Sequence, residues 1–376
     1  MTTSHNRVAS LDALRGLACL AIVIYHVTIG FDDRINFPGY PHSAFRFGLL
    51  QYSLDLFFMI SGFVILWSVQ RLRSVGDFAY GRFSRLFPTF WASLLMVSGY
   101  ILFAQHVLGA NHLGPLAFTF PQWLANVTML PHWVPGGHFE AIEGVYWTLA
   151  VEMGFYLAIG VAMAFRLTTR NRIVPLMAVV WTLDTASTGL HFLSALQSGY
   201  HGEFRDFTNL FLAGMALFLL YQDRDRPKRD RQILWVIFWS APFTDVLRFA
   251  SHRAPAVALF CVLMYFAVFR RIPGLSSRPL VWLGGLSYSL YLVHNAMGML
   301  TMKLLMDHGS SRNLAMLVAL VQAFVLAILL NKIVEKPVTR WLRRRRSSSN
   351  VARETSTRAP SLSSSISRTS PATPPN

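Results

Sequence analysis

The first apolar segment of the chain carries side chains that can do chemistry. The stretch "SLDALRGLACLAIVIYHV", residues 10–27, contains Arg15 and His26 with ten residues between them. On a helix, these positions lie within about 20° of one face, and His26 is about 16 Å further along the axis. A buried imidazole can serve as a general base or a nucleophile. It can also be a structural hydrogen-bonding group, but the cost of placing an ionisable group in a membrane favours a functional role.

Three further polar residues fall at a similar depth in other apolar segments. Asp55 lies in "LLQYSLDLFFMISGF", Glu152 in "GVYWTLAVEMGFY" and His294 in "WLGGLSYSLYLVHNAMG". With the topology given below, Asp55 and Glu152 lie about 10 Å from the outer surface, and His294 lies near mid-membrane. This set suits a His26 base whose tautomer is fixed by Asp55 or Glu152. Each residue alone could instead be a polar contact between helices.

A pair of arginines marks the start of the third apolar segment. In "YGRFSRLFPTFW", Arg82 and Arg85 are three positions apart and share one face of a helix. Arg15 falls at the same level. Arginines at a helix start suit a phosphorylated ligand, because guanidinium groups bond phosphate oxygens in pairs and the helix dipole adds positive potential. Alternatively, they are ordinary cytoplasmic anchors of a membrane protein.

Aromatic residues gather before and at the start of the fourth apolar segment. The stretch "PHWVPGGHFEAIEGVYW" contains Trp133, Tyr146 and Trp147. Their faces could bind a sugar, or they could form the aromatic belt found at membrane interfaces.

The composition indicates that membrane-spanning helices position these residues. The chain has 376 residues, of which 53% are hydrophobic and only 14% charged, whereas soluble domains carry about a quarter charged residues. The net charge of +16 would suggest nucleic acid in a soluble protein. Here the basic residues flank apolar blocks, so we expect no nucleic-acid partner. Cys19 and Cys261 lie inside apolar blocks, and without a CxxC motif we expect neither a disulfide nor a metal site.

We predict an all-α, polytopic membrane helix bundle with about ten transmembrane helices. The seventh predicted span contains Pro242, Asp245 and Arg248. Neighbouring helices must provide partners for the charged groups and for the backbone group that the proline leaves without a hydrogen bond. We expect no cleaved signal peptide. The predicted spans are 10–30, 48–69, 86–106, 145–165, 173–191, 206–221, 232–249, 254–270, 282–303 and 313–334.

The distribution of basic residues predicts the orientation. Lys and Arg follow the second, fourth, sixth and eighth spans, whereas the loop 106–144 contains neither. Both termini are therefore expected in the cytoplasm, with the protein in the plasma or inner membrane. We divide the chain into a membrane domain, residues 1–342, and a cytoplasmic tail, residues 343–376. The tail is basic and rich in Ser, Thr and Pro, which predicts disorder.

Six stretches occur in the order seen in the integral-membrane acyltransferase 3 family, which the chain resembles over residues 10–341. The resemblance implies a ten-span enzyme that moves an acyl group, commonly acetyl, from cytoplasmic acyl-CoA to a hydroxyl group. It maps Arg15 and His26 to the motif of the first span, Arg82 and Arg85 to the loop arginines, and Glu152 to the acid of the fourth span. The stretches are "LDALRGLACLAIVIYHV", "LDLFFMISGFV", "RFSRLFPTFW", "VYWTLAVEMGFY", "GGLSYSLYLVH" and "VEKP".

The residues and the resemblance together give one hypothesis. Acyl-CoA binds with its phosphates on Arg82, Arg85 and Arg15, and His26 acts with Glu152 or Asp55 as the catalytic group. The acceptor is a carbohydrate or glycolipid, such as an exopolysaccharide or lipopolysaccharide, and it meets three residues from the outer side: Tyr146, Trp147 and His294. Some family members carry a fused extracytoplasmic domain, and here we expect any second transfer to need a partner protein.

Two alternatives remain open at this point. Histidines and carboxylates inside a membrane also build the proton relays of transporters, which perform no covalent chemistry. An enzyme that modifies a membrane lipid would carry the same pattern.

Overall fold

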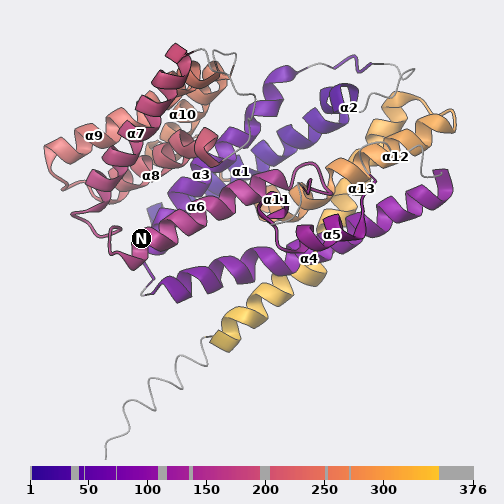
Figure 1. Ribbon diagram of the computed structural model, residues 1–376, viewed down its shortest axis with the longest axis horizontal. Coiled ribbons are helices and arrows are strands. Elements are labelled where there is room, and N and C mark those ends of the chain that lie inside the picture. The colour runs from indigo at the N-terminus through magenta and orange to yellow at the C-terminus, as the bar shows by residue number, and fades with distance from the viewer. Residues whose placement is uncertain are drawn as a thin grey trace, which may run out of the picture.

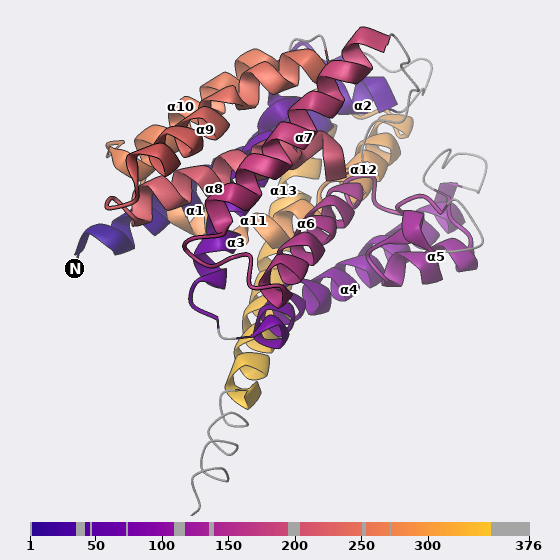
Figure 2. The ribbon, with the colours of Figure 1, turned by 60° about the vertical axis from the view of Figure 1, so that its left-hand side comes forward.

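The protein is built from packed helices. The computed structural model describes residues 2–34, 42–45, 47–72, 74–108, 117–134, 139–194, 204–249, 253–270 and 272–346. Among these residues there are only helices, turns and loops, which confirms the all-α prediction (Figure 1). Two views show α7, α8, α9 and α10 grouped on one side, α4 and α5 on the other, and α1, α3 and α11 between them (Figure 2).

Five helical stretches are long and apolar enough to cross a membrane. Three shorter apolar helices accompany them. The chain is therefore a multi-pass membrane protein. The long stretches contain α1 (Thr2–Val27), α3 (Ser53–Val69), α4 (Val75–Leu108), α6 (Trp147–Ala164) and α13 (Arg312–Leu330), and the shorter helices are α7 (Ile173–Ser194), α8 (Thr208–Gln222) and α10 (Ala254–Phe269).

The other helices account for the remaining predicted spans and the loops. The seventh predicted span is α9 (Lys228–Phe249). The ninth is divided at His294 into α11 (Arg278–Val293) and α12 (Asn295–Asp307), where the sequence predicted one continuous span. The short elements within the described ranges are α2 (Ile29–Arg34), α5 (Phe120–Val127), three 3-10 turns (Gly48–Tyr52, Pro131–Trp133 and Phe204–Phe207) and one π-helical turn (Asn331–Glu335).

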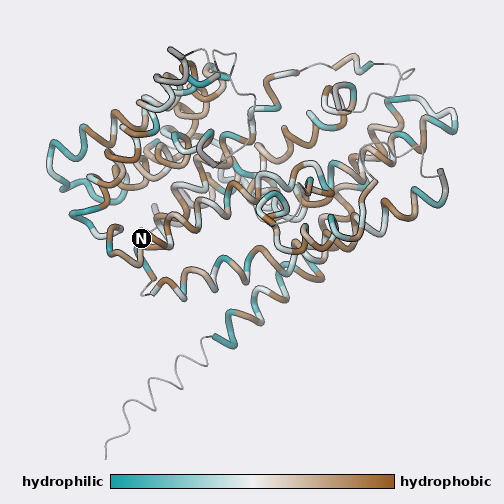
Figure 3. Tube along the Cα trace, viewed as in Figure 1, coloured by the Kyte–Doolittle hydropathy of each residue, from teal (hydrophilic) through white to brown (hydrophobic). Residues whose placement is uncertain are grey.

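Many large apolar side chains of the described residues are exposed, and hydrophobic residues recur along most helices of the trace (Figure 3). The exposed side chains include Leu95 and Phe103 on α4, Leu157 on α6, Leu183 on α7 and Leu317 on α13. A soluble protein rarely exposes so much apolar surface. This exposed apolar surface therefore faces the lipid bilayer.

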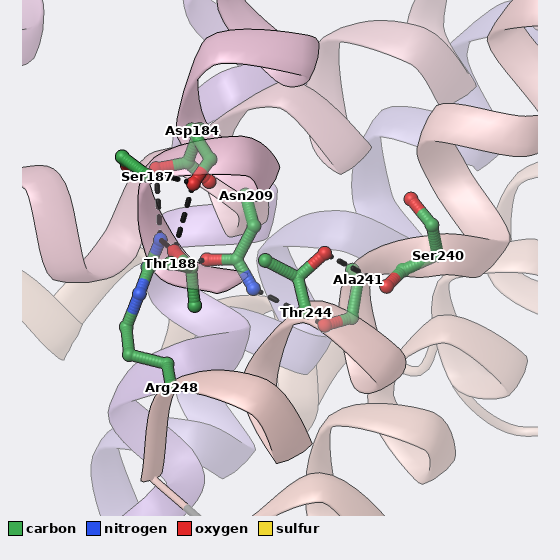
Figure 4. Close-up of polar contacts among 8 residues, drawn as sticks. All are labelled: Asp184, Ser187, Thr188, Asn209, Ser240, Ala241, Thr244 and Arg248. Atoms are coloured by element: carbon green, nitrogen blue, oxygen red, sulfur yellow. Dashed lines mark hydrogen bonds and ion pairs between the residues drawn. The ribbon is translucent and has the colours of Figure 1, made fainter. Parts of the chain in front are cut away.

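The polar groups of the seventh predicted span face neighbouring elements, and Asp245 lies 3.5 Å from the guanidinium group of Arg253. Arg248 of α9 bonds Asp184 at 2.8 Å and Thr188 at 3.0 Å, both on α7 (Figure 4). The Asn209 side chain of α8 donates to the Ala241 carbonyl at 3.2 Å, next to Pro242. These contacts join α7, α8 and α9 at a depth where unpaired polar groups would be costly.

Glycines allow two pairs of helices to approach backbone to backbone. Gly62 of α3 faces the backbone of Phe211, and Gly214 of α8 faces the backbone of Met59. A Cβ atom at either glycine would overlap the facing carbonyl group. Gly16 and Gly284 give α1 and α11 the same close contact. Close packing through small residues is how helices associate where lipid removes the hydrophobic driving force.

We expect Gly214→Ala to destabilise the protein by about 3 kcal/mol, because the methyl group forces the α3 and α8 backbones apart. The matched control is Gly99→Ala, since Gly99 lies within α4 and a Cβ there meets no atom within 4 Å among the described residues. Thermal unfolding in detergent measures the difference. Equal midpoints for the two variants would contradict the proposed close contact.

Candidate active site

Two cavities lie inside the bundle. The arginine cavity has a volume of about 90 Å³, and its charged lining residues are Arg15, Arg82, Arg85 and Glu152. The histidine cavity has a volume of about 430 Å³, and its ionisable lining residues are His26, Asp55, Arg253, Tyr25, Tyr52 and Tyr291. The sequence analysis named residues of both cavities, but it grouped Glu152 with His26, whereas Glu152 lines the arginine cavity.

The arginine cavity is built by α1, α3, α4, α6 and α11. Arg15 donates to the Ser287 hydroxyl at 3.0 Å and to the Gly284 carbonyl at 2.8 Å, and it also pairs with Asp12 at 3.1 Å. Arg82 donates to Ser68 at 2.8 Å. Arg85 faces the same cavity one turn further along α4. The structure thus brings together the three arginines that the sequence grouped.

Glu152 lies among the arginines rather than in the cavity of His26. Its Oε1 accepts hydrogen bonds from the Tyr156 hydroxyl at 2.5 Å and the Ser61 hydroxyl at 3.0 Å. Glu152 and Tyr156 are one helical turn apart, so α6 presents both to the same cavity. Three guanidinium groups and one carboxylate leave this cavity with an excess of positive charge. The predicted role of Glu152 in orienting His26 does not follow from this placement.

His26 lies against a second histidine in the interior. Both side chains are buried, with exposed fractions of 3% for His26 and 1% for His294. Their ring centroids are 5.2 Å apart. The Nδ1 atom of His294 lies 2.9 Å from the Tyr291 carbonyl oxygen, which can only accept a hydrogen bond. Nδ1 therefore carries a proton, and in a neutral His294 ring the lone pair is on Nε2.

The break between α11 and α12 places His294, and Glu143 holds this break. Glu143 is fully buried. It accepts hydrogen bonds from the Asn295 side chain at 2.5 Å and from the Ala296 backbone N–H at 2.8 Å. A carboxylate satisfies the free N–H groups of a helix start and is favoured there by the helix dipole. The sequence analysis missed Glu143 and Asn295, although Asn295 directly follows His294.

Asp55 forms a buried ion pair with Arg253, a third residue that the sequence analysis missed. Arg253 Nε and Nη2 donate to the two carboxylate oxygens at 2.7 and 2.8 Å. Asp245 lies 3.5 Å from the same guanidinium group. Asp55 and Arg253 line the histidine cavity with His26. Each Asp55 oxygen accepts one hydrogen bond from Arg253, and the partnership of Asp55 with His26 stays a prediction.

The two aromatic residues at the start of α6 have different surroundings. Trp147 lines the histidine cavity, and its ring centroid is 5.7 Å from that of Phe207. Tyr146 is 2% exposed and lines neither cavity. Its hydroxyl contacts Ser93 at 3.0 Å and donates to the Leu292 carbonyl at 3.2 Å. Tyr146 therefore joins α4, α6 and α11, and this packing argues against its predicted contact with the acceptor.

Two residues line both cavities, namely Leu54 at the start of α3 and Tyr291 near the end of α11. The compartments are therefore adjacent, one basic and the other lined by His26, while His294 packs behind His26 and lines neither cavity. No group of three His, Cys, Asp or Glu side chains within the described ranges is placed to hold a metal ion.

The fold and the two adjacent cavities define a multi-pass membrane protein with an enclosed polar site inside its helix bundle. The chain belongs to the family described as "Acyltransferase domain", which matches residues 8–332. No solved structure matches the chain.

Three curated relatives show how far the similarity extends. The chain is 25% identical to the peptidoglycan O-acetyltransferase OatA of Listeria monocytogenes over 336 residues, which cover 78% of this chain and 50% of the relative. It is 27% identical to the acyltransferase MdmB of Streptomyces mycarofaciens over 40% of this chain and 38% of the relative. It is also 25% identical to nodulation protein 10 of Rhizobium leguminosarum, with coverages of 64% and 69%. The match spans half or less of the first two relatives.

Proposed function

We propose that the protein is a membrane O-acyltransferase that transfers an acetyl group from cytoplasmic acetyl-CoA to a hydroxyl group of a carbohydrate. The observation that carries this proposal is the adjacency of the arginine cavity and the histidine cavity. One cavity suits a polyphosphate donor and the other holds a buried base. Membership of the acyltransferase family supports the same chemistry.

The donor matches the arginine cavity by charge, and its pantetheine arm matches the separation of Arg15 and His26 by length. Arg15, Arg82 and Arg85 supply guanidinium groups for the phosphates of CoA. The rise along α1 from Arg15 to His26 is about 16 Å, comparable to a pantetheine arm of roughly 15–20 Å. Acetyl-CoA with its phosphates on the arginines would therefore bring its thioester to the boundary of the arginine cavity that lies nearest His26.

His26 is the proposed general base. It removes the proton of the acceptor hydroxyl as the oxygen attacks the thioester carbonyl. A C–O bond forms, the C–S bond breaks, and the proton passes to the sulfur of CoA. The proposed role of His294 is to position His26, because its own tautomer is fixed by the Tyr291 carbonyl. The water-poor interior strengthens these electrostatic contacts.

The histidine cavity suits a carbohydrate acceptor. Trp147, Tyr52 and Phe207 offer aromatic faces, while Gln51, Asp55 and Arg253 offer polar groups. Aromatic walls with a few polar groups are the usual form of a binding site for a small organic molecule. The similarity to a protein named for peptidoglycan O-acetylation supports an acceptor of this class.

The distribution of basic residues supports the sidedness of the proposal. The arginine cavity lies toward the end of the bundle that we assign to the cytoplasm, and the acceptor reaches the histidine cavity from outside. We place the protein in the plasma or inner membrane on the same argument.

The test of the proposed function is turnover of acetyl-CoA by the purified protein in detergent. Release of the CoA thiol is followed together with the mass of added cell-envelope glycans. The expected result is thiol release and a glycan mass increased by one acetyl group. A transporter without acyl-transfer chemistry would produce neither.

We expect Arg85→Ala to raise KM for acetyl-CoA about 10- to 100-fold with a smaller effect on kcat. A hydrogen bond to a charged group contributes about 1.5–3 kcal/mol, and each 1.4 kcal/mol corresponds to a factor of ten in affinity. The matched control is Arg172→Ala, because Arg172 is exposed and lines neither cavity. If Arg85 were only a topology anchor, the amount of inserted protein would fall and KM would stay unchanged.

A further inference from the structure

We propose that Leu54 and Tyr291 form a partition between the donor and acceptor cavities, which limits the acyl group to a short chain and excludes water from the thioester. This inference rests on the proposed function. Leu54 and Tyr291 are the lining residues that the two cavities share. Any acyl group that moves from the arginine cavity to His26 must therefore pass between these side chains.

Tyr291 is fixed at both ends. Its hydroxyl donates to the Val145 carbonyl at 3.1 Å and contacts the Thr148 hydroxyl at 2.8 Å. Its own carbonyl holds His294. The ring contacts Phe57 of the arginine cavity, at a centroid distance of 6.0 Å, and His294, at 5.6 Å. A ring held in this way is a rigid wall that also orients the histidine pair.

Leu54 closes the other side of the partition. It belongs to the first turn of α3 and directly precedes Asp55. The two hydrogen bonds from Arg253 to Asp55 fix this turn. The Leu54 side chain is half-buried and lines both cavities. Leu54 is therefore the side chain that a longer acyl group would have to displace.

The partition has two consequences for the reaction. Packed interiors do not adapt freely to added methylene groups, so each carbon beyond acetyl must displace Leu54 or Tyr291. The partition also separates the thioester from water in the larger cavity. Attack by water would break the same C–S bond and form a C–O bond to the water oxygen. The products would be free acid and CoA thiol.

The test is Leu54→Ala with two matched controls. Leu149→Ala removes the same side chain from the arginine cavity alone, and Ile22→Ala shortens a residue of the histidine cavity alone. Hydrolysis of acetyl-, butyryl- and hexanoyl-CoA is measured with purified protein, and acetyl transfer is measured in native membranes that contain the acceptor. Leu54→Val is a milder variant in case the alanine variant does not fold.

We expect Leu54→Ala to raise the ratio of acetyl-CoA hydrolysis to acetyl transfer about tenfold and to admit butyryl-CoA. Leu54→Val should change both quantities in the same direction by less. The controls should keep the wild-type ratio and chain-length preference, whatever their total rates. If wild type transfers acetyl groups but Leu54 variants behave like the controls, the partition is wrong and the proposed function stands. If wild type transfers no acyl group in native membranes, the proposed function itself fails.

Discussion

Replacing His26 with alanine is expected to reduce acyl transfer about 10³-fold while the protein still folds and inserts. A positioned base contributes roughly 10²–10⁴-fold to such reactions, and no second side chain takes the place of His26 in the proposed mechanism. The loss should appear in kcat, because the donor phosphates bind in the arginine cavity. Rates of acetyl transfer at saturating acetyl-CoA measure the effect.

The matched control for this variant is His106→Ala. His106 is exposed at the far end of α4 and lines neither cavity. It should retain wild-type activity and stability. If His26→Ala kept more than a tenth of wild-type transfer, His26 would be a structural hydrogen-bonding group and the base would have to be another residue.

Replacing Arg253 with alanine is expected to destabilise the protein by about 3–5 kcal/mol, the usual cost of breaking a buried ion pair by removing one partner. The substitution leaves Asp55 and Asp245 as neighbouring carboxylates, with exposed fractions of 3% and 0%, and removes their shared cation. Thermal unfolding in detergent should show the loss. The double variant Asp55→Asn, Arg253→Gln should recover part of it, because it removes the unpaired Asp55 charge.

An exposed ion pair provides the comparison. Arg170 also bonds a carboxylate through two nitrogens, at 2.8 and 3.1 Å from Asp223, but its side chain is 60% exposed. Exposed pairs contribute about 0–1 kcal/mol, so Arg170→Ala should change the unfolding midpoint little. Equal shifts for Arg253→Ala and Arg170→Ala would show that burial gives the Asp55–Arg253 pair no special role.

The sequence predicted the helical class and most helix positions because each span is a local run of apolar residues. It also grouped Arg15, Arg82 and Arg85 correctly, since their positions near helix ends follow from charge counting. What local patterns could not predict is which polar groups meet across the bundle. Asp55 and Arg253 are 198 positions apart, and nothing near either residue identifies the other.

The interruption at His294 shows the same limit. The segment around it contains no proline at the break and reads as one apolar span. The division depends on Glu143, which belongs to a loop about 150 positions away and binds the start of α12. Tyr146 illustrates the opposite error, because an aromatic residue at a span boundary resembles a surface group. Its hydroxyl is satisfied inside the bundle by Ser93 and Leu292.

The most direct test of the proposed transfer from cytoplasmic acetyl-CoA to an acceptor outside is a vesicle experiment. Labelled acetyl-CoA, which does not cross the bilayer, is added to sealed vesicles prepared in either orientation from cells that produce the protein. We predict that inside-out vesicles incorporate the label into lumen-facing glycan and that right-side-out vesicles do so only after permeabilisation. Efficient labelling of intact right-side-out vesicles would contradict the account.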